Sequence, residues 1–251
     1  MNDKNPFLDH IIITGGLSGI GLETLKVISH NNPKSKIIIT SREHESGFKK
    51  LKQAFPESKN IELLELDLSK DISVDNFLKE IKKNCKQIFS LILNGGFIET
   101  SPCLMTTQNS IEEHLKINYT NNIKIVQFIV RKYMLKQKHG SVVNISSSAA
   151  KFANGGRLAY AASKAAMTLA IKVMSRELGK NNITFNSISP GLTESKLMRN
   201  STDEDKIEDY LNCVDNRRIG MPREIAYLIN FLISDKNTHI TGQDISIDGG
   251  I

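Results

Sequence analysis

The sequence predicts an α/β fold, in which one doubly wound, seven-stranded parallel sheet has helices on both of its faces. The first reason is alternation, because short apolar runs and longer amphipathic stretches succeed one another along the whole chain, as in consecutive β–α–β units. The second reason is composition. The first five apolar runs are rich in Ile, Leu and Val, which is typical of strands that helices cover on both sides.

These two patterns place each element. The apolar runs predict strands near residues 10–14, 36–40, 61–66, 88–93, 140–146, 183–188 and 244–247. Apolar residues at helical spacing predict helices near residues 19–30, 44–54, 73–84, 108–136, 158–180 and 222–233. Strands that alternate with helices in this way pair in parallel, because a crossover connection is needed between them.

The chain shows no internal division. It has no linker rich in Pro, Gly or Ser and no repeat, so we expect residues 1–251 to form a single domain. Residues 193–218 depart from the regular pattern, because they are polar and weakly periodic. A stretch of this length inside a compact domain predicts a substrate loop or lid.

Composition excludes several classes of protein. Of the 251 residues, 39% are hydrophobic and 24% are charged, as in an ordinary globular domain. No window approaches the roughly 18 apolar residues of a membrane span, so we expect no membrane partner. The net charge is +6, but the basic residues are scattered and Trp is absent. A nucleic-acid binder is therefore an alternative that only the charge suggests, and we expect no nucleic-acid partner.

The cysteines and the N-terminus indicate the compartment. Cys85, Cys103 and Cys213 are odd in number and far apart, which fits reduced thiols better than a disulfide framework or a zinc site. The six His are scattered singly, so we expect no metal. Residues 1–6 lead directly into the apolar run at 11–13, without the basic and long apolar segments of a signal peptide. We therefore expect a cytoplasmic protein.

A glycine-rich turn follows the first expected strand. Residues 14–21 read TGGLSGIG and lead into a helical pattern. Glycines permit tight backbone angles and let a pyrophosphate approach the N–H groups at the start of the helix, where the helix dipole favours negative charge. The turn predicts a dinucleotide site, and a purely structural strand-to-helix turn is the alternative.

Tyr160 and Lys164 are four residues apart in a segment expected to be helical. They therefore share one helix face and can act on one substrate oxygen. A phenol with a pKa of about 10 is a poor acid–base catalyst at neutral pH, and a nearby ammonium lowers that pKa because it favours the phenolate. The pattern alone is common by chance, so its weight depends on the other motifs.

Together these motifs resemble the short-chain dehydrogenase/reductase family, whose members have a single-domain Rossmann fold. Further matches, which extend the resemblance over essentially the whole chain, are Asp67-Leu68, Asn94-Gly95-Gly96, Pro190-Gly191, Thr241-Gly242-Gln243 and Asp248-Gly249-Gly250. The chain departs from the family's Asn-Asn-Ala-Gly turn, because Leu93 replaces the first Asn and Gly95 replaces the Ala. Ser195 stands where the family commonly has Thr.

The resemblance implies a catalytic group. Tyr160 exchanges a proton with the substrate, and Lys164 lowers the pKa of Tyr160 and binds the nicotinamide ribose. A serine at the end of the fifth strand holds and polarises the carbonyl. Ser146 and Ser148 are candidates by composition, but the family's offset of thirteen residues from Tyr160 favours Ser147. The implied catalytic residues are Ser147, Tyr160, Lys164 and Asn118, which in the family organises a water of the proton relay.

The resemblance also implies a nicotinamide cofactor. The residues expected to contact it are Thr14, Gly15, Leu17, Ser18, Gly19, Ile20, Gly21, Ser41, Arg42, Asp67, Leu68, Asn94, Gly95, Tyr160, Lys164, Pro190, Gly191, Thr193 and Ser195. Ser41 stands where a carboxylate would bind the ribose 2′-hydroxyl of NAD, and Arg42 follows it. A 2′-phosphate would meet a hydroxyl and a guanidinium there, so we predict NADP(H) in preference to NAD(H). Stacking of Arg42 on adenine is the alternative.

The substrate is less well specified, because in this family variable loops build the pocket, here around residues 97–107, 149–158 and 192–218. The resemblance suggests a 3-oxoacyl thioester on acyl carrier protein. Lys138 matches one basic carrier-docking position of such reductases, but Asn181 replaces the other. A sugar, a small ketone or a secondary alcohol are equal alternatives.

Three further expectations complete the prediction. Arg157, Arg217 and Arg218 are either solvated charges or ligands of an anionic substrate tail. A catalytically silent cofactor-sensing or scaffold protein is the alternative from another functional class. The family further implies a homotetramer or homodimer, packed through the helices near residues 108–136 and 158–180.

Overall fold

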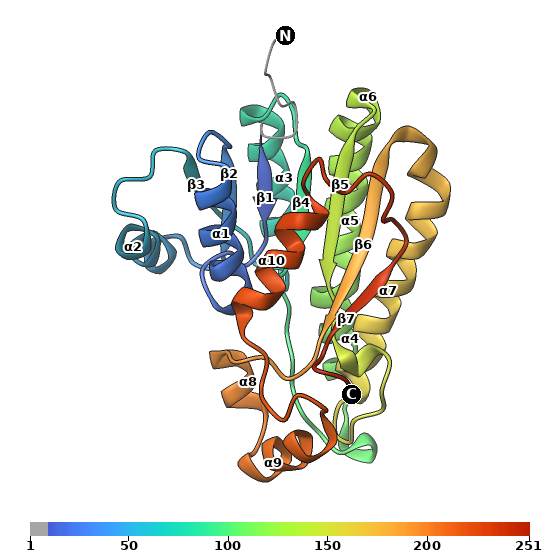
Figure 1. Cartoon of the computed structure of the whole chain (residues 1–251). Coiled ribbons are helices and arrows are strands. Elements are labelled where there is room, and N and C mark those ends of the chain that lie inside the picture. The colour runs from blue at the N-terminus through green and yellow to red at the C-terminus, as the bar shows by residue number, and fades with distance from the viewer. Residues whose placement is uncertain (1–9) are drawn as a thin grey trace.

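The computed structural model describes residues 10–251, and within them seven parallel strands form one sheet in the order β3-β2-β1-β4-β5-β6-β7 (Figure 1). The strands are β1 (Ile11–Ile13), β2 (Ile37–Ser41), β3 (Ile61–Glu65), β4 (Ser90–Leu93), β5 (Gly140–Ile145), β6 (Ile183–Pro190) and β7 (Asp244–Ile247). The predicted doubly wound sheet is confirmed. The chain reverses its direction of winding between β1 and β4, and a crevice for ligands opens beyond the carboxyl ends of strands at such a switch point.

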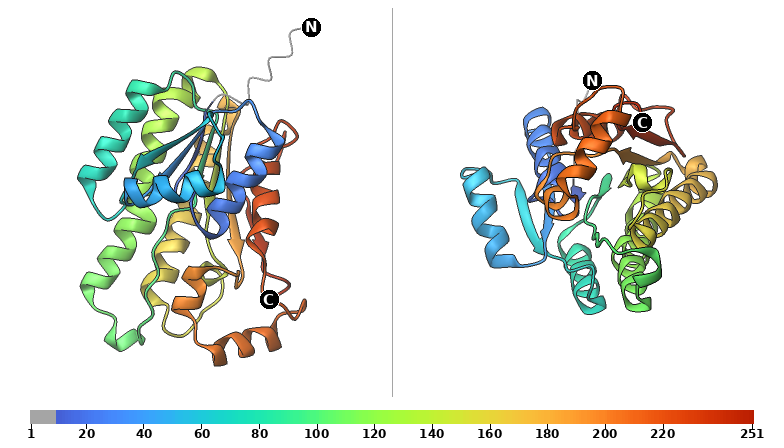
Figure 2. Two further views of the ribbon diagram at one scale, coloured as in Figure 1. Left: turned by 90° about the vertical axis from the view of Figure 1, so that its left-hand side faces the viewer. Right: turned by 90° about the horizontal axis from the view of Figure 1, so that it is seen from below.

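Helices cover both faces of the sheet (Figure 2). One face packs against α1 (Gly19–Asn31), α2 (His44–Ala54) and α10 (Pro222–Leu232). The other face packs against α3 (Asp71–Asn84), α5 (Asn121–Ile129) and α7 (Leu158–Leu178). The described residues also include three short 3-10 helices, which are η2 (Cys103–Met105), η5 (Ser148–Ala150) and η6 (Gly179–Asn181).

Burial on both faces explains the continuous apolar runs of the strands. In β1, Ile12 packs into the core under α3 and α5, whereas Ile11 and Ile13 point to the opposite core under α1 and α10. The three side chains are almost completely buried because successive residues of a strand alternate between faces. No residue of β1 faces solvent, and all three of its residues are therefore apolar.

The helical stretch expected over 108–136 is not one regular α-helix. It comprises α4 (Gln108–Leu115), the π-helix η3 (Lys116–Thr120), α5, a second π-helix η4 (Val130–Met134) and α6 (Leu135–Gln137). Single π-turns inside helices are often found at functional sites, because the extra residue rotates the following side chains. Asn118 lies in the first of these π-turns, where it is buried.

Residues 193–218, hereafter the α8–α9 segment, contain two helices where the sequence predicted an irregular loop. These are α8 (Lys196–Ser201) and α9 (Glu204–Cys213), which lie beyond the carboxyl ends of the strands (Figure 1). Ser195 begins α8, because its Oγ accepts a hydrogen bond from the Met198 N–H at 3.0 Å. α9 has no buried residue and therefore adds little to the core.

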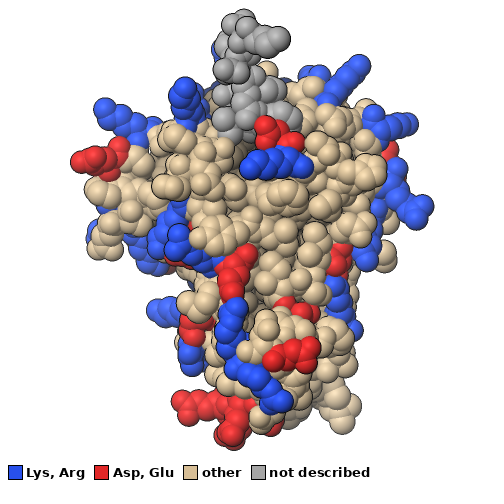
Figure 3. Space-filling view, viewed as in Figure 1, with Lys and Arg blue, Asp and Glu red and all other residues tan. Residues whose placement is uncertain are grey.

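The remaining expectations concern the surface and the N-terminus. Within residues 10–251 no helix is long and apolar enough to cross a membrane. On the face shown in Figure 3, Lys and Arg are spread out with Asp and Glu among them, as expected for a solvated surface. Residues 1–9, which bear on the expected lack of a signal peptide, lie outside the described residues.

Candidate active site

The glycine-rich turn packs too closely for side chains at two of its positions. A Cβ on Gly16 would lie 2.8 Å from Cβ of Ile39, and one on Gly21 would collide with the carbonyl oxygen of Gly15. Gly15 and Gly19 have φ angles of +66° and +48°, which favour glycine. The turn therefore brings bare backbone to the carboxyl end of β1, as close approach of a pyrophosphate requires.

The start of α1 is suited to an anion. Ser18 is the N-cap, and within the described residues its side chain makes no capping hydrogen bond. The first N–H groups of a helix lack intrahelical partners, and the helix dipole adds positive potential there. The first turn also contains no acidic residue. The residues present therefore fit a cofactor phosphate, which Ser18, Gly19, Ile20 and Gly21 would hold.

Thr14 and Asn94 join this turn to the end of β4. Thr14 Oγ1 accepts hydrogen bonds from the N–H groups of Asn94 and Gly95, at 3.0 and 2.9 Å. Asn94 Nδ2 donates to the carbonyl oxygens of Thr14 and Gly15, at 3.1 and 2.9 Å. Thr14 is 0% exposed, and its hydroxyl holds the two loops in register. The Asn94-Gly95 departure from the family turn still makes this connection.

The end of β2 presents Ser41 and Arg42. Ser41 is half-buried beside Gly47 of α2, where a Cβ would lie 2.9 Å from the Ser41 hydroxyl. Arg42 is exposed, and its guanidinium makes no hydrogen bond or ion pair within residues 10–251. No carboxylate side chain stands at either position, so nothing at these two residues would repel a 2′-phosphate.

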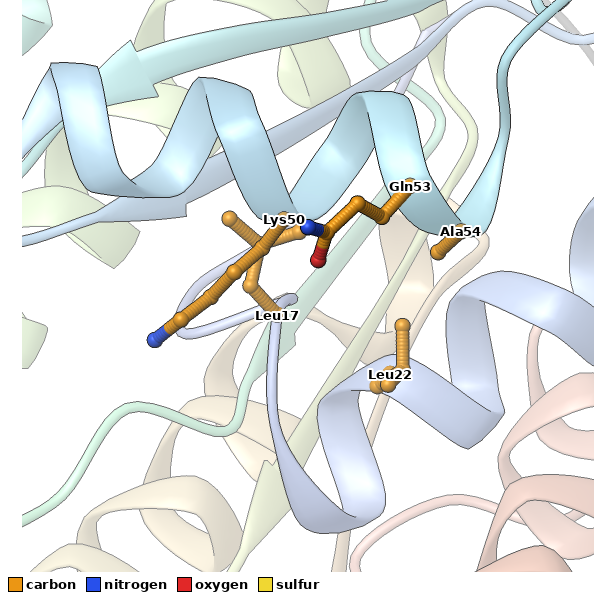
Figure 4. Close-up of a pocket in the computed structure, with 5 residues that line it drawn as sticks. All are labelled: Leu17, Leu22, Lys50, Gln53 and Ala54. Carbon is orange, nitrogen blue, oxygen red and sulfur yellow. The ribbon is translucent and has the colours of Figure 1, made fainter.

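A shallow cavity of about 290 Å³ lies between the glycine-rich turn and α2. Figure 4 shows that Leu17 of the turn and Leu22 of α1 lie on the side of the cavity opposite α2, which contributes Lys50. Gln53 and Ala54 complete its lining. Leu17 thus contributes an apolar wall at the turn, whereas the catalytic group lies elsewhere.

Asp67 and Leu68 follow β3. The Asp67 carboxylate accepts hydrogen bonds from the N–H and Oγ of Ser69 at 3.0 and 2.7 Å, and it pairs with Lys70 at 3.3 Å. Burial raises the pKa of Asp67, but these contacts outweigh it and hold the pKa below its usual value. Leu68 is buried, and its side chain packs close to Gly95. The two residues therefore shape the crevice beside Gly95.

Ser147 and Tyr160 meet at the carboxyl end of β5. The Ser147 side chain lies close enough to the Tyr160 phenol to lower its pKa. Ser146 is buried and its hydroxyl is bonded to Thr168 at 2.6 Å, and Ser148 is also buried. Of the three serines, Ser147 is the one that is only partly buried.

Lys164 lies one helical turn beyond Tyr160 on α7. Its Nζ donates to the carbonyl oxygen of Ile145 at 2.7 Å and lies 5.9 Å from the centre of the Tyr160 ring. Lys164 is 6% exposed, and burial lowers its pKa to about 8. Burial also raises the pKa of Tyr160, while the Ser147 side chain and the positive charge of Arg157 oppose that rise.

Asn118 holds the backbone after β4. Its Oδ1 accepts from the Phe97 N–H at 2.8 Å, and its Nδ2 donates to the Phe97 carbonyl at 2.8 Å and to Ser163 Oγ at 3.0 Å. Ser163 in turn donates to the carbonyl of Tyr160 at 2.8 Å. Asn118 therefore connects the loop at Phe97 to the helix that bears Tyr160.

The residues after β6 complete the site. A Cβ on Gly191 would lie 2.8 Å from Cα of Asp248, so this turn also depends on glycine. Thr193 is buried and donates to the Gly191 carbonyl at 3.0 Å, which leaves its hydroxyl occupied within the chain. Ser195 lies next to the glycine-rich turn, since its Cβ is 3.4 Å from where a Cβ on Gly19 would be. Pro190 ends β6 and is buried.

Three residues have contacts that the sequence interpretation did not predict. His114 of α4 is 0% exposed, with Nε2 3.1 Å from the Glu99 N–H and Nδ1 2.7 Å from the Ser110 carbonyl. The position of a histidine on the apolar face of a helix was the sequence feature that could have indicated this buried contact. Arg157, expected to be solvated or to bind a substrate tail, instead contacts the α8–α9 segment. Arg218 is bonded to Glu224 at 3.0 Å and is likewise occupied.

Comparison with known proteins agrees with this geometry. A family profile described as Enoyl-(Acyl carrier protein) reductase matches residues 15–251. The 3-oxoacyl-(acyl-carrier-protein) reductase FabG of Thermotoga maritima is 29% identical over 240 residues, which cover 96% of each protein. FabG of Escherichia coli (strain K12) is 25% identical, again with 96% of each protein covered.

A solved structure, 4-hydroxyisoleucine dehydrogenase complexed with NADH, is 26% identical with a TM-score of 0.87, covering 96% of this chain and 98% of that one. The profile spans the glycine-rich turn, the Ser147–Tyr160–Lys164 group and the closing strand together. The chain therefore belongs to the short-chain dehydrogenase/reductase family of NAD(P)-dependent oxidoreductases.

Proposed function

We propose that this enzyme interconverts a carbonyl and a secondary alcohol with NADP(H), and that Ser147, Tyr160, Lys164 and Asn118 form its catalytic machinery. The observation that supports the proposal most strongly is the proximity of the Ser147 side chain to the Tyr160 phenol, with Lys164 one helical turn away. These groups lie at the same edge of the sheet as the glycine-rich turn, because all the strands are parallel.

Each side chain has a separate task in this mechanism. The bound nicotinamide supplies or accepts the hydride at the substrate carbon. The Ser147 hydroxyl donates a hydrogen bond to the carbonyl oxygen and polarises it. Tyr160 gives that oxygen a proton in reduction and removes one in oxidation. Lys164 offers an ammonium to the cofactor ribose, and Asn118 keeps the Phe97 backbone in place beside Tyr160.

NADP(H) is our proposal for the cofactor. Arg42 is exposed and uncommitted within the described residues, and Ser41 precedes it in place of an acid. Turnover with NADPH and NADH at equal concentration tests the choice, and Arg42→Ala should weaken NADPH binding while leaving NADH binding nearly unchanged. A wild-type preference for NADH would reject the assignment.

A 3-oxoacyl thioester, presented on acyl carrier protein, is our proposal for the substrate. This proposal is supported by the similarity to the FabG proteins, which are named as 3-oxoacyl-(acyl-carrier-protein) reductases. Lys138 adds little to it, because Lys138 lies two residues before β5 and therefore at the edge of the sheet opposite to Ser147, which follows β5. Asn181, at the amino end of β6, lies at that same opposite edge.

The test is a substrate screen that follows NADPH absorbance with 3-oxoacyl thioesters, sugars and small ketones side by side. Tyr160→Phe should reduce turnover by at least about a hundredfold, because a general acid contributes a factor of this order, while NADPH still binds. Residual turnover close to wild type in this variant would refute the proposed machinery. An inactive wild-type protein that still binds NADPH would instead favour a cofactor sensor or scaffold.

A small hydroxylated substrate is the second candidate. It is favoured by the similarity to 4-hydroxyisoleucine dehydrogenase complexed with NADH, because the name of that enzyme describes a hydroxylated amino acid. The oxidation arm of the same screen, run with hydroxy amino acids and NADP or NAD, distinguishes the two. Faster oxidation of these alcohols than reduction of any thioester would select this candidate.

We further propose that residues 1–251 form one domain in which the α8–α9 segment covers the site, and that the protein is a homotetramer or homodimer. Leu169 and Val173 support the second proposal, because they are exposed and lie four residues apart on one face of α7. Tyr227 and Phe231 have the same arrangement on α10. Apolar stripes of this kind are suited to symmetric helix packing.

A further inference from the structure

Arg157 contacts the α8–α9 segment from the start of the catalytic helix. It is the residue before α7, three positions before Tyr160. Its Nη2 donates hydrogen bonds of 3.0 Å to the Ser201 carbonyl and 3.0 Å to Thr202 Oγ1. Ser201 and Thr202 form the turn between α8 and α9, so this one side chain holds that turn against the catalytic helix.

Two weaker contacts reinforce the same junction. Thr100 Oγ1 donates to the Ser201 carbonyl at 3.4 Å, and the Ser101 N–H donates to the Gly156 carbonyl at 3.0 Å. Three chain segments that border the site, near residues 97–107, 149–158 and 193–218, therefore meet around Arg157. Arg157 supplies the charged group at their junction.

The charge of Arg157 has no neutralising partner. Within residues 10–251 no Asp or Glu lies within ion-pair distance of it, and its hydrogen-bond acceptors are neutral oxygens. Burial lowers its pKa, yet a guanidinium stays protonated in proteins. A half-buried, unpaired positive charge acts more strongly on its neighbours than a solvated one, because water screens it less.

Tyr160 is the titratable neighbour on which this charge acts. Burial raises the pKa of Tyr160, and the Ser147 side chain and the Arg157 charge oppose the rise. The other cation near the phenol, Lys164, lies 5.9 Å from its ring centre and is bonded to the Ile145 carbonyl. Arg157 therefore acts on the phenol through space, one turn along the same helix.

We propose that Arg157 is a positioning residue that couples closure of the α8–α9 segment to the protonation state of Tyr160. One guanidinium performs both tasks, since it holds the Ser201–Thr202 turn over the site and places a positive charge that favours the phenolate. This inference rests on the proposed role of Tyr160 as the acid–base group.

Three variants separate the two tasks. Arg157→Gln removes the charge, Arg157→Lys keeps the charge but loses the planar donor group, and Thr202→Val removes one acceptor on the α8–α9 segment without changing any charge. The titration of Tyr160 is read from tyrosinate absorbance, as the difference between each protein and the same protein carrying Tyr160→Phe. Closure is read from amide hydrogen exchange of residues 196–213.

In Arg157→Gln we expect the Tyr160 titration to move up by about one pH unit, as for loss of a nearby opposite charge, and exchange in the segment to accelerate. Thr202→Val should accelerate amide exchange in the segment severalfold without changing the pH at which Tyr160 titrates. In Arg157→Lys, Tyr160 should titrate as in the wild type, while exchange in the segment should remain fast. Where an alcohol substrate is known, the midpoint of the pH profile for its oxidation should follow the same order.

The inference is overturned if Arg157→Gln, folded as judged by its melting temperature, titrates like wild type, or if exchange in the segment is unchanged in both Arg157→Gln and Thr202→Val. Failure of the proposed function has a different signature. There, Tyr160→Phe keeps wild-type turnover, whatever the Arg157 variants do.

Discussion

Single residues in the glycine-rich turn determine how closely a cofactor can approach. Gly21 illustrates this, because a Cβ there would collide with the Gly15 carbonyl and lie 2.6 Å from Asn94 Nδ2. Neither obstacle is the flexible end of a long side chain. The turn itself would have to move to accept even alanine, and its backbone is what faces the expected pyrophosphate.

Gly21→Ala should therefore weaken NADPH binding by at least about tenfold, since overpacking at a rigid site costs on the order of 1–3 kcal/mol. The measurement is calorimetric titration with NADPH. Gly155→Ala is the matched control, because a Cβ at Gly155 meets no described atom within 4 Å. Equal affinities in the two variants would show that the turn relaxes without cost.

Lys164 imposes a pH-dependent cost on folding. Its pKa falls from 10.5 to about 8 on burial, so the folded protein disfavours the charged form. The cost is fully present below pH 8 and disappears as the pH rises to 10.5, because both states then hold the neutral amine. The difference corresponds to roughly 3 kcal/mol. A buried lysine that destabilises the fold is not expected for structural reasons alone, and its presence is consistent with a functional role for Lys164.

Lys164→Met should accordingly raise the free energy of unfolding at pH 7 by about 2 kcal/mol, after allowance for the lost bond to the Ile145 carbonyl, while abolishing turnover. Denaturant titration at pH 7 and pH 10.5 checks both the gain and its loss at high pH. Lys172→Met, on the exposed side of the same helix, is the control. A destabilised Lys164→Met at pH 7 would contradict the sign.

At the scale of elements, the site depends on the connection between the ends of β1 and β4. These strands are neighbours in the sheet, and the chain winds away from them in opposite directions. The four hydrogen bonds between Thr14–Gly15 and Asn94–Gly95 hold their loops together at the switch point. A crevice whose two walls come from separate β–α units needs such a connection to keep its width.

Asn94→Ala removes the two bonds donated by the Asn94 amide and leaves the Thr14 and Gly15 carbonyls short of a partner. We expect a loss of about 1–3 kcal/mol in unfolding free energy and weaker NADPH binding. Thermal unfolding with and without NADPH measures both. Asn84→Ala, whose amide bonds Glu80 at the exposed end of α3, should change neither. An unchanged NADPH affinity in Asn94→Ala would mean that other contacts set the crevice width.

At the scale of the whole molecule, the exposed apolar stripe on α7 predicts association. Leu169 is 63% exposed on a helix whose opposite side forms the core, and Ile72 of α3 is 65% exposed. Light scattering should give a multiple of the 28.0 kDa chain mass for the wild-type protein. Leu169→Glu should reduce that mass, because a charge at a helix interface costs several kcal/mol, and Ile72→Glu should not. A wild-type monomer would disprove the proposed assembly.

The order of the strands and helices, and the spacing of the candidate catalytic residues, were predictable from short-range sequence patterns. Apolar runs and helical spacing are local properties, so strands and helices such as β2 and α2 lie within a residue or two of their predicted limits. The spacing of Tyr160 and Lys164 is equally local, since one helical turn brings them together. Even Arg42 was identifiable, because it directly follows a strand.

Other features follow from contacts between residues far apart in the chain, which no local pattern encodes. The choice of Ser147 over Ser146 depends on packing against Thr168, and the role of Thr14 depends on Asn94, eighty residues away. The α8–α9 segment buries little apolar surface, so its position depends on contacts such as Arg157 to Thr202. The sequence by itself thus determined the fold class, the cofactor turn and the candidate catalytic residues. Only the tertiary structure decided which groups are buried, bonded and charged beside Tyr160, because burial and electrostatics arise from the folded surroundings.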